Sequence, residues 1–126
     1  LIGTDAVDQV TAKLLIIENA QAAGVPVLSA MGAGNKLHPE ALELAMLSET
    51  QVCPLARVMR REVKKRGLGD FPVVYSKEAP KKVEGMEERS PASISFVPSA
   101  AGLIAASKVI RDLVQCEKEE RLVREL

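Results

Sequence analysis

Two aspartates near the start of the sequence have the residue type and spacing for phosphate chemistry. Asp5 follows an apolar stretch that predicts a strand over residues 1–4, and Asp8 falls in the first turn of the helix predicted next. Open α/β sheets bind ligands outside the carboxyl ends of their strands. Carboxylates there suit Mg²⁺, which binds through one or two carboxylates plus substrate phosphates. Acidic residues also cap helices and complement their dipoles, and spacing alone favours this simpler role.

A loop of small residues follows the second predicted strand. Gly32, Gly34 and Asn35 lie in a Gly-Ala-Gly-Asn run shortly after the apolar residues 25–29. Glycine lets a backbone approach a ligand closely, so this loop is a candidate for the same site. Its spacing matches neither a P-loop nor the dinucleotide-binding pattern. The residues alone therefore favour a tight turn.

A basic helix is predicted over residues 54–66. Arg57, Arg60, Arg61 and Lys64 share neighbouring faces of this helix at three- and four-residue spacing. Such a patch could bind the phosphates of tRNA. An acidic residue in the same helix offsets some of the charge, and a solvated helix face is an equally good interpretation.

The composition describes an ordinary globular domain. The chain has 126 residues, of which 47% are hydrophobic, and 17 basic residues balance 17 acidic ones. This length supports one compact core, and the charge balance excludes a whole-chain argument for nucleic-acid or membrane binding. The two cysteines form no C-x-x-C pair, which indicates neither a zinc site nor a disulfide framework. With this cysteine pattern, the reducing cytoplasm is the simplest expected setting. No apolar run is long enough to cross a bilayer.

The start of the sequence predicts a strand, a helix and a second strand. Val10, Leu14 and Ile17 recur at helical spacing within the helix predicted over 7–23, and Gly24 is placed to end it. Such a unit belongs to a parallel sheet. The chain opens on the first strand without an initiator Met, which we interpret as a fragment whose N-terminal part is missing.

The remaining sequence predicts further strands and helices around a surface loop. Apolar and polar or small residues alternate over 42–46, although this stretch also has helix propensity. In order, the elements are a strand over 39–48, the basic helix over 54–66, strands over 72–76 and 93–97, and a helix over 98–115. The polar stretch over 77–90 predicts a mobile surface loop. We therefore expect one domain over 1–116, followed by a charged tail over 117–126 for which a helix is one interpretation.

Four segments carry a resemblance to a known family. They are TDAVDQVTAKLLIIENAQAAGVPVLSAMGAGNKLHP, CPLARVMRREVKKRG, PVVYS and SPASISFVPSAAGLIAASKVIRDLV. In this order and spacing they resemble the second half of the ThiF/MoeB/HesA adenylating enzymes, which share their domain with ubiquitin-activating enzymes. The second segment and the run SISFVPS are typical of the tRNA threonylcarbamoyladenosine dehydratase branch.

The resemblance implies an α/β fold, the C-terminal half of a Rossmann-like ThiF-type domain with a mixed sheet flanked by helices. It also implies an enzyme that binds ATP and Mg²⁺ and adenylates the threonylcarbamoyl carboxylate on a tRNA adenosine, after which ring closure expels AMP. By matching positions, it implies that Asp8 is the catalytic ligand of Mg²⁺ and ATP. Asp5 supports it, and Lys13 holds the basic position of the following helix. The Gly-Ala-Gly-Asn loop matches the segment beside the substrate.

Parts of the family's site are absent from this sequence. The Gly-rich nucleotide loop and the Arg and Lys that bind ATP belong to the family's N-terminal half, so we expect this fragment alone to be inactive. The family commonly dimerises, and a homodimer is expected. Two alternatives remain open. One is an activator of a ubiquitin-like sulfur-carrier protein, for which a C-x-x-C pair is usual, and the other is a non-catalytic dimerisation module.

Overall fold

The computed structural model describes residues 2–6, 9–33, 36–79 and 95–125. The strands are β1 (Gly3–Asp5), β2 (Val27–Ala30), β3 (Leu42–Met46) and β4 (Pro72–Ser76). The helices are α1 (Val10–Ala22), α2 (Pro54–Lys65) and α3 (Phe96–Glu125), and the short 3-10 helices η1 (Pro39–Ala41) and η2 (Leu47–Glu49) flank β3. The strand predicted over 39–48 is confirmed in its centre, while the loop predicted over 77–90 is described only at 77–79.

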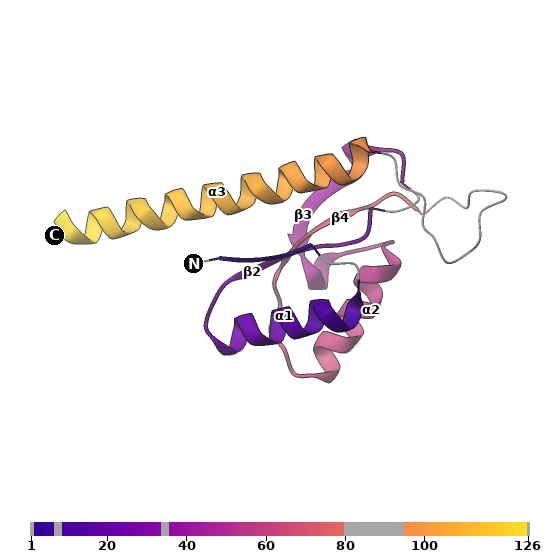
Figure 1. Cartoon of the computed structure of the whole chain (residues 1–126), viewed down its shortest axis with the longest axis horizontal. Coiled ribbons are helices and arrows are strands. Elements are labelled where there is room, and N and C mark those ends of the chain that lie inside the picture. The colour runs from indigo at the N-terminus through magenta and orange to yellow at the C-terminus, as the bar shows by residue number, and fades with distance from the viewer. Residues whose placement is uncertain (1, 7–8, 34–35, 80–94, 126) are drawn as a thin grey trace.

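Within the described residues, four strands form one sheet in the order β1-β2-β4-β3. β1, β2 and β4 are parallel, and β3 is antiparallel to β4. α1 and α2 cover one face of the sheet, and α3 lies across the other (Figure 1). This arrangement confirms the predicted mixed sheet flanked by helices. The carboxyl ends of the three parallel strands meet at one edge.

Alternation along the strands builds an apolar core on each face of the sheet. Val27 and Val73 belong to the cluster on the face of α1 and α2. Their neighbours Leu28 and Val74 belong to the cluster with Ala101 of α3. Successive side chains of a strand point to opposite faces, so β2 and β4 are buried on both sides. This is why both strands read as continuous apolar runs.

Glycines end α1 and α2 in the same way. Gly24 and Gly67 have φ angles of 69° and 67°, a left-handed conformation that glycine adopts without steric cost. After α1, the Gly24 N–H donates to the Gln21 carbonyl at 3.1 Å, and the Val25 N–H donates to the Ala20 carbonyl at 2.8 Å. The equivalent pair of bonds follows α2. These bonds satisfy the last carbonyls of each helix and confirm that a glycine ends α1 as predicted.

The strand predicted over 93–97 is wrong in the part that the structure describes. Ser95 lies in a turn, and Phe96 begins α3. Val97 and Ala101 are both buried, and their four-residue spacing is that of a helix face. Alternation over so short a segment does not distinguish a strand from a helix. The rest of the segment lies outside the described residues.

α3 also continues through the predicted charged tail. The helix predicted over 98–115 and the tail, for which a helix was one interpretation, form one unbroken helix that ends at Glu125. From residue 113 onward its described residues are exposed, and the helix extends past the sheet (Figure 1). No helix in the described residues, α3 included, is both long enough and apolar enough to cross a membrane.

Candidate functional site

A buried ion pair joins the end of β1 to α1. Lys13 Nζ lies 3.0 Å from Asp5 Oδ2, and the two side chains are 1% and 0% exposed. Ser29 Oγ donates to the same Asp5 oxygen at 2.6 Å. Lys13 Nζ also donates to the Ala30 carbonyl at 2.7 Å. We call Asp5, Lys13 and Ser29 the Asp5 cluster.

Strand register and helix packing explain how the Asp5 cluster forms. β1 and β2 pair in parallel with Asp5 opposite Ser29, so the hydroxyl lies beside the carboxylate. Lys13 is buried on the same side of α1 as Leu14 and Ile17, which face the sheet. Removing one partner of such a buried pair costs about 3–5 kcal/mol. The cluster therefore holds β1, α1 and β2 together at the carboxyl edge of the sheet.

A cavity of about 360 Å³ opens at this edge, and we call it the carboxyl-edge cavity. Among its described lining residues, Lys13 supplies the one charged side chain. Small and apolar residues from the loop after β2, from α2 and from α3 form much of the wall, namely Met31, Gly32, Leu55, Pro98, Ala101 and Gly102. The cavity lies where open α/β sheets bind ligands, outside the carboxyl ends of parallel strands.

The structure brings some of the predicted site residues together at this cavity. Lys13 and Gly32 line it, and Asp5 is bonded to Lys13. Asp8, Gly34 and Asn35 lie outside the described residues. Their roles in Mg²⁺, ATP and substrate binding stay predictions.

The basic residues of α2 do not line the carboxyl-edge cavity. Arg60 is half-buried, and its Nη1 donates to the Thr50 carbonyl at 2.9 Å and to the Thr50 hydroxyl. Arg57, Arg61 and Lys64 are exposed. Arg60 thus attaches α2 to the turn that precedes it, whereas the other three side chains point into solvent.

Three groups with shifted pKa values do not line this cavity: Glu43 on β3, Tyr75 on β4 and Lys77 directly after β4. Tyr75 Oη donates to Glu43 Oε1 at 2.9 Å, and Lys77 Nζ lies 2.9 Å from Glu43 Oε2. The hydrogen bond from Lys77, followed by that from Tyr75, lowers the pKa of Glu43. Burial, followed by the hydrogen bond to Glu43, raises the pKa of Tyr75. The bond to Glu43 likewise raises the pKa of Lys77. Ion pairs within a fold also shift pKa values, and here they join two antiparallel strands.

Sequence comparison identifies the relatives of this chain. No protein-family model matches it. It is 32% identical over 126 aligned residues to the tRNA threonylcarbamoyladenosine dehydratase of Bacillus subtilis (strain 168), a match covering 88% of this chain and 50% of the relative. It is 44% identical over 77 residues to tRNA threonylcarbamoyladenosine dehydratase 2 of Saccharomyces cerevisiae, covering 60% of this chain and 17% of that protein. Over most of its length, this chain is therefore similar to tRNA threonylcarbamoyladenosine dehydratases.

Solved structures of an Escherichia coli tRNA threonylcarbamoyladenosine dehydratase share the fold of this chain. The complex with AMP superposes with a TM-score of 0.80 at 22% identity, covering 92% of this chain and 49% of that one. The complex with ATP gives a TM-score of 0.77 over the same shares. The chain therefore spans about half the length of the Bacillus relative and of the solved structures.

Other bonded residues were not predicted from the sequence, namely Ser29 of β2 and the residues that join the segment before η1 to the end of β4. Ser29 is fully buried in β2, and a hydroxyl within an apolar strand was the available signal. The Glu78 carboxylate accepts the Leu37 N–H at 3.0 Å and the His38 N–H at 2.8 Å. Lys36 Nζ donates to the Glu78 carbonyl at 2.7 Å. Lys36 and Glu78 lie 42 positions apart, and no local sequence pattern predicts a contact over that separation.

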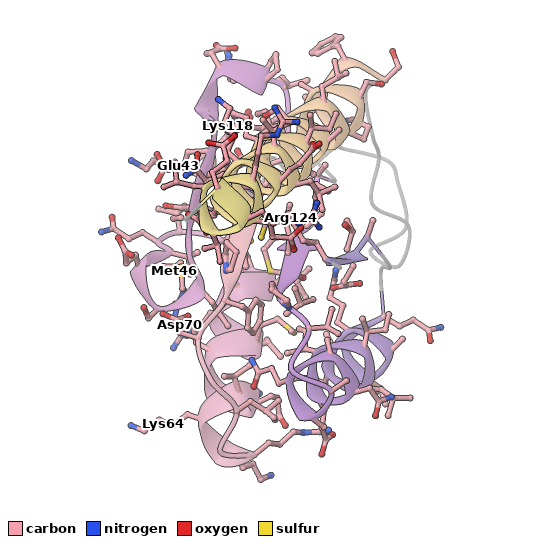
Figure 2. The ribbon with its side chains drawn as sticks, turned by 90° about the vertical axis from the view of Figure 1, so that its left-hand side faces the viewer. Glu43, Met46, Lys64, Asp70, Lys118 and Arg124 are labelled. Carbon is pink, nitrogen blue, oxygen red and sulfur yellow. The ribbon has the colours of Figure 1, made fainter. Side chains whose placement is uncertain are left out.

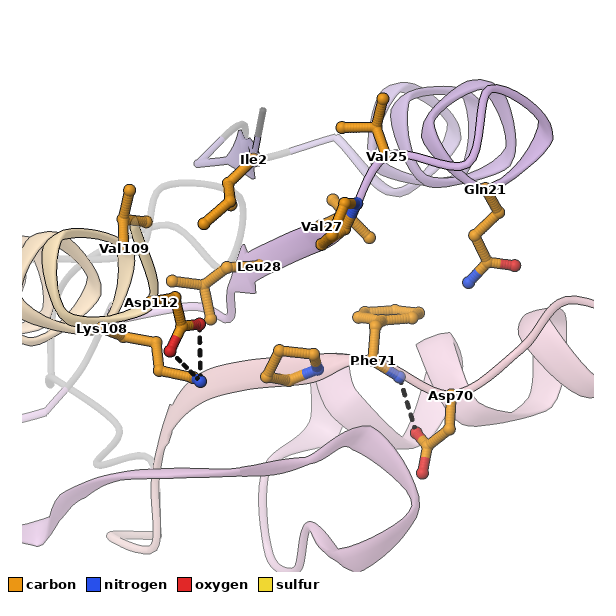
Figure 3. A pocket seen from close by; sticks show the side chains of 12 residues that line it. Ile2, Gln21, Val25, Val27, Leu28, Asp70, Phe71, Lys108, Val109 and Asp112 are labelled. Atoms are coloured by element: carbon orange, nitrogen blue, oxygen red, sulfur yellow. Dashed lines mark hydrogen bonds and ion pairs between the residues drawn. The ribbon is translucent and has the colours of Figure 1, made fainter. Parts of the chain in front are cut away.

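A second cavity, of about 230 Å³, lies at the amino ends of the parallel strands (Figure 3). Leu28 and Phe71 contribute apolar surface to it. On one side, Lys108 Nζ lies 2.7 Å from Asp112 Oδ2, so these two charges compensate each other. Ligands of open α/β sheets bind at the opposite ends of the strands. We therefore assign the candidate site to the carboxyl-edge cavity.

Proposed function

We propose that the intact protein containing this sequence is an ATP-dependent adenylating enzyme that acts as a tRNA threonylcarbamoyladenosine dehydratase in the cytoplasm. The similarity to the Bacillus subtilis dehydratase over 88% of this chain supports the proposal. The observation that carries it is the carboxyl-edge cavity. Its lining includes Lys13 and Gly32, which belong to the first of the four segments that resemble the adenylating family.

The proposed reaction has two steps. A carboxylate oxygen of the threonylcarbamoyl group attacks the α-phosphorus of ATP, and pyrophosphate leaves. A nucleophilic atom within the substrate then closes a ring on the activated carbonyl carbon, loses its proton and expels AMP. Mg²⁺ would supply the charge that phosphoryl and adenylyl transfer require near the phosphates.

The residues of this chain would have distinct roles in that reaction. We assign Mg²⁺ to Asp8 and to the phosphates of ATP, a coordination typical of this ion. Asp5 fits a supporting role, because its Oδ2 already accepts bonds from Lys13 and Ser29. The charge of Lys13 is compensated by Asp5, so Lys13 would orient a polar group in the cavity rather than neutralise a phosphate alone. The Gly-Ala-Gly-Asn loop would lie beside the substrate.

We also propose that the intact protein forms a homodimer. Leu103, Ile110 and Val114 are 73%, 60% and 44% exposed. They lie on the side of α3 opposite Ala101 and Ala105, which pack on the sheet. Their seven- and four-residue spacing is that of a helix–helix seam. Light scattering should give the mass of a dimer, and Ile110→Glu should reduce it to that of a monomer.

AMP release tests the proposed function. The intact protein should release AMP from ATP when tRNA carrying threonylcarbamoyladenosine is present, and not with unmodified tRNA. Asp8→Ala should abolish the release. Asp112→Ala, which removes a carboxylate on α3 that does not line the carboxyl-edge cavity, should leave it unchanged. Release that ignores tRNA but responds to a small protein with a Gly-Gly tail would instead indicate a sulfur-carrier activator. No release under either condition would favour a non-catalytic module.

A further inference from the structure

The exposed side of α2 carries several basic side chains, and only some of them have a partner within the described residues. Ala56, Met59 and Val63 are the buried residues of this helix, and its basic residues lie on the remaining faces, as helical periodicity requires. They are Arg57, Arg60, Arg61, Lys64 and Lys65, with Arg66 directly after the helix.

Two of these side chains have partners within the protein. Arg60 Nη1 donates to the Thr50 carbonyl at 2.9 Å. Arg66 forms two ion pairs: its Nη1 lies 3.7 Å from Glu18 Oε2, and its Nε lies 3.8 Å from Glu62 Oε2. In the part of the chain that the structure describes, the other four side chains make no hydrogen bond or ion pair. We call these four the α2 cationic face: Arg57, Arg61, Lys64 and Lys65. Lys64 points away from the body of the protein (Figure 2).

The stability of the helix does not explain the α2 cationic face. Arg57 and Arg61 are four residues apart, as are Arg61 and Lys65, and like charges at this spacing destabilise a helix. Arg57 lies in the first turn, where the helix dipole is positive and disfavours a cation. Only Lys64 and Lys65 lie in the last turn, where the dipole favours them. A negatively charged partner would offset this repulsion between like charges.

The position of α2 relates this face to the candidate site. Leu55, in the first turn of α2, lines the carboxyl-edge cavity, and the first residue of the cationic face is Arg57. From Arg57 to Lys65 the helix rises about 12 Å. Since an α-helix has 3.6 residues per turn, Arg57 lies on another side of α2 than Leu55. The cations therefore begin in the helix turn that borders the cavity, lie on another side of α2 from it, and continue along the helix over a length that exceeds a single phosphate group.

We propose that the α2 cationic face binds the sugar–phosphate backbone of an RNA whose reacting nucleotide occupies the carboxyl-edge cavity. The contacts are to phosphates and do not depend on base sequence. Compared with the sequence prediction, Lys65 replaces Arg60, because Arg60 is bonded to Thr50. The identity of the RNA as modified tRNA rests on the proposed function, whereas binding of an RNA backbone does not require adenylation.

Salt-dependent tRNA binding by the intact protein tests this proposal. Fluorescence anisotropy would be measured between about 50 and 200 mM salt, and each neutralised phosphate contributes about 0.7–0.9 to the slope of log K against log salt. The double variant Arg57→Gln/Arg61→Gln should lose roughly 1.4–1.8 of that slope and bind tRNA more weakly at the lower salt. Lys118→Gln/Arg124→Gln, which removes two exposed cations of α3, should bind like wild type. Arg60→Gln should lower the melting temperature and leave the slope unchanged.

Each outcome bears on the proposal. An unchanged slope in Arg57→Gln/Arg61→Gln, or an equal loss in the α3 control, would overturn it. Wild-type protein that binds vesicles of anionic lipid but not tRNA would also overturn it. If tRNA binds with the expected slopes but no AMP is released, the proposed function fails while this inference stands. If AMP release requires modified tRNA but both double variants behave alike, the inference fails and the proposed function stands.

Discussion

The Lys13–Asp5 ion pair allows a quantitative test of how the carboxyl edge is held. Lys13→Met keeps a long apolar side chain but leaves the Asp5 carboxylate, whose side chain is 0% exposed, without its cation. Breaking such a pair costs about 3–5 kcal/mol, a large part of the roughly 5–15 kcal/mol that stabilises a typical domain. For 126 residues, an unfolding entropy of about 2.1 cal/mol/K per residue predicts a fall in melting temperature of roughly 11–19 °C.

The double variant Lys13→Met/Asp5→Asn separates the charge from the packing. Because both charges leave together, it should recover much of the loss seen in Lys13→Met. Lys108→Met is the matched control. Its partner is Asp112, the two side chains are 31% and 44% exposed, and the expected cost is about 0.5 kcal/mol or less. Thermal and urea unfolding, followed by circular dichroism, measure these three variants and the single variant Asp5→Asn, which completes the comparison.

Two results would refute this reasoning. One is a cost below about 1 kcal/mol for Lys13→Met, since a buried charge that loses its partner should cost several times more than an exposed one. The other is a double variant as unstable as the sum of its single variants, because coupled residues should not behave additively.

Two further predictions concern the titration of Tyr75 and the opposite effects of alanine at two glycines, Gly67 and Gly102. Because burial and Glu43 raise the pKa of Tyr75, phenolate absorbance should appear at higher pH in the folded chain than in urea. Stability should fall as pH rises past the unfolded value of about 10, and less steeply in Tyr75→Phe. Gly67 has a φ of 67°, so Gly67→Ala should lower the free energy of unfolding by about 1–2 kcal/mol. Gly102 lies within α3 and has open space around an added Cβ, so Gly102→Ala should raise the free energy of unfolding by up to about 1 kcal/mol. Urea unfolding measures both glycine variants, and stability changes of the same sign would contradict the reasoning.

The opening strand–helix–strand unit could be predicted from the sequence, because local residues determine it. Val10, Leu14 and Ile17 repeat at the period of a helix, and Gly24 adopts the left-handed conformation that ends α1. The apolar run of β2 reflects burial on both faces of the sheet. Local patterns failed over 95–97, where a few alternating residues fitted a strand and a helix equally well.

Only the tertiary structure decided the sheet order and the Asp5 cluster. Strand pairing joins residues far apart in the chain, and no local property of β3 sets its place beside β4. Asp5 was a candidate by spacing and Lys13 by resemblance, yet neither implied their buried ion pair or its bond to Ser29. Local sequence determines which residues favour a helix or a strand. The packing of α1 onto two paired strands determines which polar groups lose water together and must satisfy one another.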